Sequence, residues 1–115
     1  MGIFTDFKTK KQLADIVRRI FASQELGPEY LLVAFREGRS GAYGIRNSLA
    51  RKVSLSATFR DAHAKTLLAA DAIISAADAY EASCGIDGDQ LKSWDSAVAM
   101  QSVATVANAW KLAID

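Results

Sequence analysis

The sequence predicts an all-α protein, a small bundle of four to five helices dominated by a long antiparallel helical hairpin at its C-terminal end. Residues 57–84 contain ten alanines and neither glycine nor proline, a composition that favours one long helix. Elsewhere, large apolar residues recur at intervals of three and four, the spacing of one helix face. A chain of 115 residues can bury a core without a disulfide or a metal, so we expect residues 1–115 to form a single helical domain.

The first predicted helix covers about residues 10–24. Thr9 and Gln12 have the spacing of a capping box, in which each side chain satisfies a free backbone N–H group. Apolar residues then follow at helical spacing: Leu13, Ile16, Val17, Ile20 and Phe21. The preceding residues 1–8 contain a further apolar group, Ile3, Phe4 and Phe7. We expect this group to form either an extra helical turn or an N-terminal arm that docks on the core or on another copy.

A second helix is predicted over about 28–37, because Pro28 suits a first helical position and Gly38 suits a helix end. The apolar run 30–35 would also fit a short buried strand, since periodicity does not separate the two at this length. Residues 38–44, GRSGAYG, hold three of the seven glycines and are predicted to form a glycine-rich loop. A short helix over 45–52 should follow.

The predicted C-terminal hairpin pairs a helix over about 56–84 with one over about 90–114. Ser54 or Ser56 would cap the first helix, and Asp87 or Asp89 the second. The first helix shows a seam of mostly small residues that allows a close neighbour: Phe59, Thr66, Ala70, Ile73, Ala77, Tyr80 and Cys84. The second has a matching apolar stripe: Met100, Val103, Ala107, Trp110 and Ile114.

The last predicted helix is apolar on more than one side, which indicates a second contact surface. Trp94 and Trp110, sixteen residues apart, would lie about 160° apart around a helix of 3.6 residues per turn. One of them therefore packs on the first two helices or on another copy of the chain. The candidate interface residues are Trp94, Val98, Trp110 and Leu112.

No catalytic or metal site is predicted. His63 and Cys84 lie 21 residues apart on one predicted helix, about 31 Å at 1.5 Å per residue, and cannot form a nucleophile and base pair within one chain. A zinc site needs several Cys or His ligands, and the chain has one of each. We expect no cofactor. With no apolar run near the roughly 20 residues that span a bilayer, and no apolar signal segment, we also expect a cytoplasmic protein outside the membrane.

The charge distribution offers one candidate anion site. Residues 1–60 carry 11 Lys and Arg against 5 Asp and Glu, whereas residues 61–115 carry 3 against 8. Five basic residues surround the predicted glycine loop: Arg36, Arg39, Arg46, Arg51 and Lys52. Arginines and flexible backbone N–H groups can hold phosphate oxygens, although a solvated basic loop would have the same composition.

Two functions are therefore expected from the sequence. The first is a non-catalytic protein–protein interaction module, such as a small regulator, adaptor or inhibitor, that self-associates through its long helices or binds a protein partner. The alternative is binding of an anion or nucleic acid through the basic segment 36–52.

Overall fold

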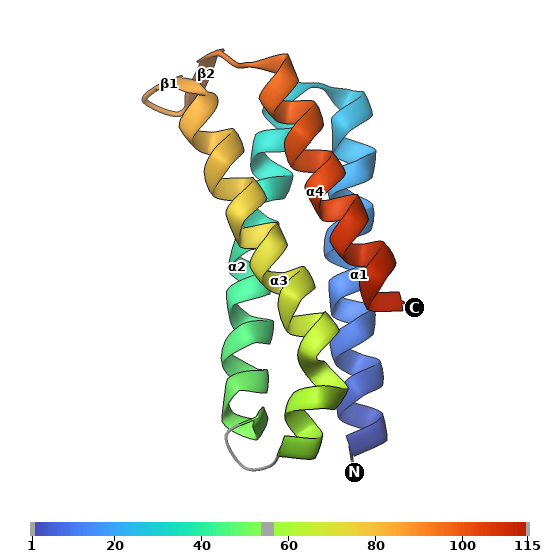
Figure 1. Cartoon of the computed structure of the whole chain (residues 1–115). Helices are drawn as coiled ribbons and strands as arrows, with labels where there is room; N and C mark the ends of the chain where they lie inside the picture. The colour runs from blue at the N-terminus through green and yellow to red at the C-terminus, as the bar shows by residue number, and fades with distance from the viewer. Residues whose placement is uncertain (1, 54–56, 115) are drawn as a thin grey trace.

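A computed structural model shows four helices in an antiparallel bundle, with a small β-hairpin between the last two (Figure 1). The structure describes residues 2–53 and 57–114, without the side chains of 2–7, 52, 53, 57, 59, 60 and 62. The prediction of an all-helical fold is confirmed, with a two-stranded sheet in addition. The elements are α1 (Gly2–Leu26), α2 (Pro28–Val53), α3 (Ala57–Ser83), β1 (Gly85–Asp87), β2 (Gln90–Ser93) and α4 (Ser96–Ile114).

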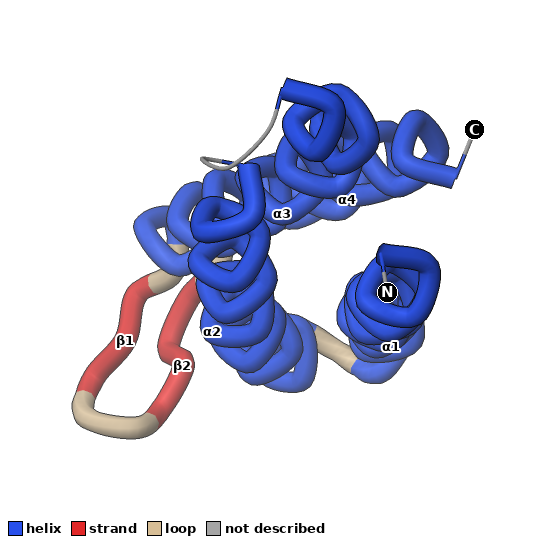
Figure 2. The backbone as a smooth tube through the Cα atoms, turned by 90° about the horizontal axis from the view of Figure 1, so that it is seen from below, coloured by secondary structure: helices blue, strands red, loops and turns tan. Residues whose placement is uncertain are grey.

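Consecutive helices are neighbours around the bundle. α2 packs on α1 and on α3, and α4 packs on α3, whereas the contact between α1 and α4 is less extensive than these (Figure 2). With 19 residues, α4 is also the shortest helix, so it covers only the part of the bundle nearer the hairpin, and the C-terminus lies partway along the molecule (Figure 1). We call the end that carries β1 and β2 the hairpin end.

The described residues share one hydrophobic core along the bundle axis. Phe35 of α2 and Tyr80 of α3 lie at its centre, with ring centroids 5.5 Å apart. The Tyr80 hydroxyl donates a 2.9 Å hydrogen bond to the Pro28 carbonyl oxygen, which satisfies a polar group that would be costly to bury alone. The predicted seam of α3 is largely confirmed, because five of its residues are buried: Thr66, Ala70, Ile73, Ala77 and Tyr80.

The predicted glycine-rich loop over 38–44 is wrong, since α2 runs without a break from Pro28 to Val53. The strand alternative for 30–35 is wrong for the same reason. The glycines serve helix packing: a Cβ atom added to Gly38 would lie 3.0 Å from Ile16 Cγ2, and one added to Gly41 would lie 2.8 Å from Ile16 Cδ1. The absence of side chains at these two positions therefore allows α1 to approach α2 closely.

Of the two alternatives for residues 1–8, the helical one is confirmed for the described backbone. Helix α1 begins at Gly2 and ends at Leu26, so the backbone of the predicted arm is an N-terminal extension of the helix. Gly27, with φ of 135°, ends α1 and separates it from Pro28, the first residue of α2.

The predicted helical hairpin of 56–84 and 90–114 is not confirmed in that form. α3 matches its predicted range, but residues 85–93 form a β-hairpin whose strands pair Ile86 with Leu91 and Asp87 with Gln90. Gly88, with φ of 65°, stands first in the two-residue turn, as in a type II′ hairpin turn. The two aspartates predicted as caps therefore belong to this hairpin.

The cap of α4 is Asp95 instead. Its Oδ1 atom accepts hydrogen bonds from the backbone N–H groups of Ala97 and Val98, at 2.9 and 3.2 Å. The predicted apolar stripe of α4 is also partly wrong, because Met100 and Ile114 are 66% and 56% exposed. The buried residues of α4 are Ser102, Val103, Val106 and Ala113. Ser54 and Ser56, the predicted caps of α3, lie outside the described residues.

Candidate interaction surfaces

The predicted basic cluster lies along the contact between α2 and α3, where carboxylates of α3 face the arginines. Arg39 Nη1 lies 2.7 Å from Asp78 Oδ1, and Arg39 Nη2 lies 2.8 Å from Glu81 Oε2. Three further ion pairs extend this contact or lie beside it: Arg36–Glu81 at 3.1 Å, Arg46–Asp71 at 3.7 Å and Arg19–Glu37 at 3.7 Å. The opposite charges of the two halves of the chain therefore meet within one molecule.

Hydrogen bonding between these groups shifts their pKa values. The bond from Arg36, followed in strength by the bond from Arg39, holds the pKa of the Glu81 carboxyl below its ordinary value, although partial burial acts in the opposite direction. The pKa of Arg39 is raised, chiefly by its hydrogen bond to Asp78. Both shifts favour the charged forms of Glu81 and Arg39, so the ion pair between these two residues persists at neutral pH.

The predicted anion site relied on flexible backbone N–H groups and on unpaired arginines, and the structure differs on both points. Residues 38–44 are helical, so their backbone N–H groups are used in α2, and Arg36, Arg39 and Arg46 already contact carboxylates. Arg51 is exposed near the end of α2. The side chain of Lys52 lies outside the described ones.

The four predicted interface residues lie in three different places. Trp94 precedes α4 at the hairpin end and is 51% exposed. Trp110 is half-buried between α4 and α1, in a small hollow that it shares with Val17 and Phe21. Only Val98 and Leu112 lie on a common surface of α4, fourteen residues apart along the helix.

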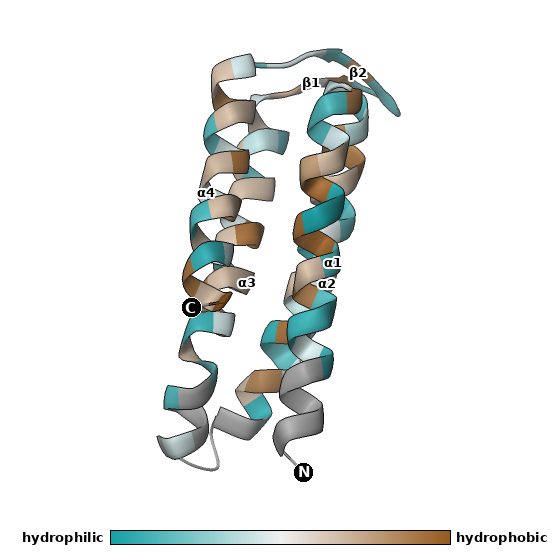
Figure 3. Ribbon diagram, turned by 90° about the vertical axis from the view of Figure 1, so that its right-hand side faces the viewer, coloured by the Kyte–Doolittle hydropathy of each residue, from teal (hydrophilic) through white to brown (hydrophobic). Residues whose placement is uncertain are grey.

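Val98 and Leu112 belong to a surface without charged side chains, which we call the α3–α4 face. On α4 its residues recur at intervals of three and four: Val98, Gln101, Thr105, Asn108 and Leu112. On α3 a second stripe has the same spacing: Leu68, Ala72, Ser75, Ala79 and Ala82. Of these ten side chains, Ala72 and Val98 are half-buried and the other eight are exposed. Towards the start of α3 the same spacing leads to the exposed Lys65, which lies beyond the uncharged face. Figure 3 shows that α3 and α4 form one side of the bundle and α1 and α2 the other.

A shallow groove of about 250 Å³ runs between the two stripes. Its walls are formed by small and uncharged side chains: Ser75, Ala76, Ala79, Val98, Gln101, Ser102 and Thr105. The Thr105 hydroxyl donates a 2.9 Å hydrogen bond to the Gln101 carbonyl oxygen, so covering this hydroxyl would leave no donor unsatisfied. The groove therefore presents little polar surface that resists removal from water.

His63 is buried on α3 and Cys84 is half-buried just after the same helix. No three His, Cys, Asp or Glu residues of the described ranges lie close enough together to hold a metal ion. Within the same ranges, no helix combines the length and apolar character that a membrane span requires.

Comparison of the chain with protein-family models, with curated proteins and with solved structures gives no match. Its function is therefore inferred from the contacts, charges and burial of its own residues.

Proposed function

We propose that this protein is a non-catalytic interaction module that forms a homodimer through the α3–α4 face. The main support is that neither stripe of this face contains a charged side chain. By contrast, α1 and α2 expose charged residues on their outer surfaces, among them Lys11, Arg18, Arg19, Glu29, Glu37 and Arg46. Burying an unpaired charge in an interface is costly, so the α3–α4 face is the side of the bundle that can be covered at the lowest cost.

The spacing of the stripes favours a helical partner with the same spacing. Residues that alternate at three and four along a helix pack against a neighbour crossing at a shallow angle, as in coiled coils and four-helix bundles. Small residues such as Ala79 and Ser75 allow the two backbones to approach closely. A second copy supplies two such stripes of its own, and related by a two-fold axis the two faces would form a four-helix layer.

The available area is enough for a modest dimer. The 19 residues of α4 extend about 28 Å, and two helices side by side are about 20 Å wide. The face therefore covers about 560 Å² per copy, or about 1,100 Å² in the dimer, slightly above the roughly 1,000 Å² expected of a specific interface. We therefore expect a dissociation constant in the micromolar range.

No observation favours the alternative of phosphate or nucleic-acid binding through residues 36–52. Arg36, Arg39 and Arg46 contact carboxylates of α3, and an incoming phosphate would have to displace those carboxylates.

The proposal is tested by sedimentation velocity over about 1 to 200 µM, a range that brackets micromolar affinity. The wild-type chain should change from one chain of 12.4 kDa to twice that mass. Ala79→Glu combined with Thr105→Glu places one carboxylate in each stripe and should abolish the dimer. The matched control is Ala22→Glu with Asn47→Glu, which adds the same charges at exposed positions of α1 and α2 and should leave the dimer intact. A wild-type monomer at every concentration, or equal effects of the two double variants, would overturn the proposal.

A further inference from the structure

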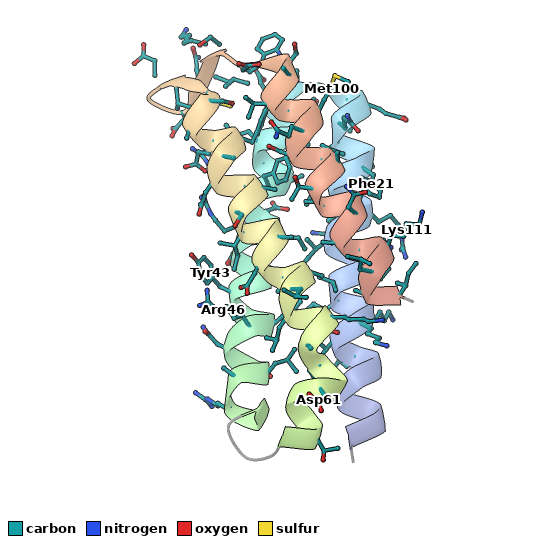
Figure 4. The ribbon with its side chains drawn as sticks, in the orientation of Figure 1. Phe21, Tyr43, Arg46, Asp61, Met100 and Lys111 are labelled. Carbon is teal, nitrogen blue, oxygen red and sulfur yellow. The ribbon has the colours of Figure 1, made fainter. Side chains whose placement is uncertain are left out.

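The hairpin end of the bundle exposes a second apolar surface, distinct from the α3–α4 face. Five large apolar side chains there are each at least half exposed: Leu26, Tyr30, Val33, Trp94 and Met100. They come from the end of α1, the first two turns of α2, the segment after β2 and the start of α4, all of which lie at this end (Figure 1). Figure 4 shows Met100 at this end and Asp61 at the opposite one. Exposed apolar groups gathered in one place are typical of a binding surface.

A hollow of about 160 Å³ opens within this surface. Its lining includes the buried side chains of Leu31 and Tyr80 and the exposed ones of Trp94 and Met100. The Tyr80 hydroxyl already donates a hydrogen bond to the Pro28 carbonyl oxygen. A ligand in the hollow therefore does not need to supply an acceptor for it. Apolar cavities of about 150 Å³ hold a benzene ring. The hollow is therefore large enough for one aromatic or branched aliphatic side chain.

Carboxylates lie at the same end of the bundle, and two of them adjoin residues that line the hollow: Glu25 follows Gln24, and Asp95 follows Trp94. Five acidic residues from the two connections at this end are exposed: Glu25, Glu29, Asp87, Asp89 and Asp95. Within residues 24–30 and 85–97 the one basic residue is Lys92, and its Nζ atom donates a 2.9 Å hydrogen bond to Gln90 Oε1. The hairpin end is therefore negative, and its potential favours positively charged partners.

We infer that the hairpin end binds a segment of a partner protein in which one large apolar side chain is flanked by lysines or arginines. The apolar side chain fills the hollow against Trp94 and Met100, where burial provides most of the affinity, as at interface hot spots. The flanking basic residues face Glu25 and Asp95, which adjoin the lining residues Gln24 and Trp94 and provide selectivity and a faster encounter. An acidic segment, or a basic one without the apolar side chain, lacks one of the two contributions.

The probe for this inference is a fluorescein-labelled peptide, GKKFKKG, blocked at both ends. Two control peptides remove one contribution each: GKKSKKG lacks the aromatic anchor, and GEEFEEG reverses the charge. Fluorescence anisotropy should show at least tenfold tighter binding of GKKFKKG than of either control, and weaker binding as salt rises from about 50 to 200 mM, because these charges are exposed to solvent.

Variants of the protein locate the site. Trp94→Ser should reduce the affinity for GKKFKKG at least tenfold. Glu25→Gln with Asp95→Asn should weaken binding and reduce its salt dependence, and asparagine can still cap α4. The matched control removes two exposed carboxylates elsewhere, by Asp15→Asn with Asp61→Asn, and should bind as the wild type does. Equal binding of GKKFKKG and GKKSKKG, or unchanged binding by both hairpin-end variants, would overturn the inference.

A second measurement reports on the hollow directly. In a Trp110→Phe background, Trp94 is the remaining tryptophan, so its emission should shift to the blue when GKKFKKG covers it. Unchanged emission at saturation would contradict the assigned site. The same titration on the Ala79→Glu, Thr105→Glu variant separates this inference from the dimer proposal, because peptide binding should persist in a chain that no longer dimerises.

Discussion

Replacing glycines of α2 by alanine tests the continuous helix and its packing. Gly44 is exposed, and a Cβ atom added there would meet nothing within 4 Å. In a helix interior, alanine is about 1 kcal/mol more favourable than glycine. Gly44→Ala should therefore raise the free energy of unfolding by about 1 kcal/mol, or the melting temperature by about 4 °C for a chain of this size. No gain is expected if residues 38–44 form a loop.

Gly41 and Gly38 should respond differently because α1 lies against them. At Gly41 the added Cβ atom would lie 2.8 Å from Ile16 Cδ1, the end of a side chain that can shift. At Gly38 it would lie 3.0 Å from Ile16 Cγ2, 3.4 Å from Ile20 Cδ1 and 3.7 Å from Ile73 Cγ2. Overpacking of a core costs about 1–3 kcal/mol. Gly41→Ala should thus gain less than Gly44→Ala, and Gly38→Ala should lose stability.

A double-mutant cycle isolates the contact at Gly41. Ile16→Val removes the Cδ1 atom nearest to the new methyl group, so Gly41→Ala should become about as favourable as Gly44→Ala in that background. The same background should not rescue Gly38→Ala, since valine keeps the Cγ2 atom. Thermal and urea unfolding at one fixed protein concentration give the four stabilities, because a dimer melts at a concentration-dependent temperature. Full additivity of Ile16→Val and Gly41→Ala would refute the assigned packing.

Three further predictions concern single interactions. Because the pKa of Glu81 lies below its ordinary value in the folded protein, its stabilising contribution should be complete at neutral pH and be lost as the pH falls below about 4.5. The melting temperature of Glu81→Gln should therefore fall less than that of the wild type over the same acidic range. Asp95→Ala removes two hydrogen bonds at the start of α4 and should cost about 1 kcal/mol in urea unfolding; a Ser replacement should recover most of it. Tyr80→Phe removes the hydrogen bond to the Pro28 carbonyl and should cost about 1 kcal/mol; an unchanged melting temperature would show that this bond contributes nothing.

The sequence predicts α3 well because the signal there is local. A long alanine-rich run without glycine or proline favours a helix whatever surrounds it, and the buried positions follow its seam. The glycines of α2 are different, because Gly38 and Gly41 are compatible with either a loop or a close helix contact. The choice depends on Ile16, more than twenty residues away, which local propensity does not include.

Residues 85–93 contain a sequence pattern typical of a β-hairpin, but the same residues also contain a pattern typical of a helix start. The pair Gly88-Asp89 between segments in which apolar and polar residues alternate, such as Gln90-Leu91-Lys92, is typical of a hairpin turn. Aspartates before an apolar stretch are equally typical of a helix start. The α3–α4 face was harder to predict, because alanine and serine occur at both buried and exposed positions. Its identity as one surface follows only from the placement of α4 beside α3.

The ion pairs between α2 and α3 also bear on how the two helices are aligned along their axes. The step of seven residues from Arg39 to Arg46 is matched by a step of seven back along α3, from Asp78 to Asp71, so all pairs share one antiparallel alignment. Alanines along a seam resist axial sliding only weakly, because each offers a single methyl group. Displacing α3 by one turn, about 5.4 Å, would separate Arg46 from Asp71 and leave Arg39 with one carboxylate at most, in place of the two that it now contacts. The ion pairs thus favour one axial alignment of α2 and α3, whereas the small apolar residues alone would tolerate several.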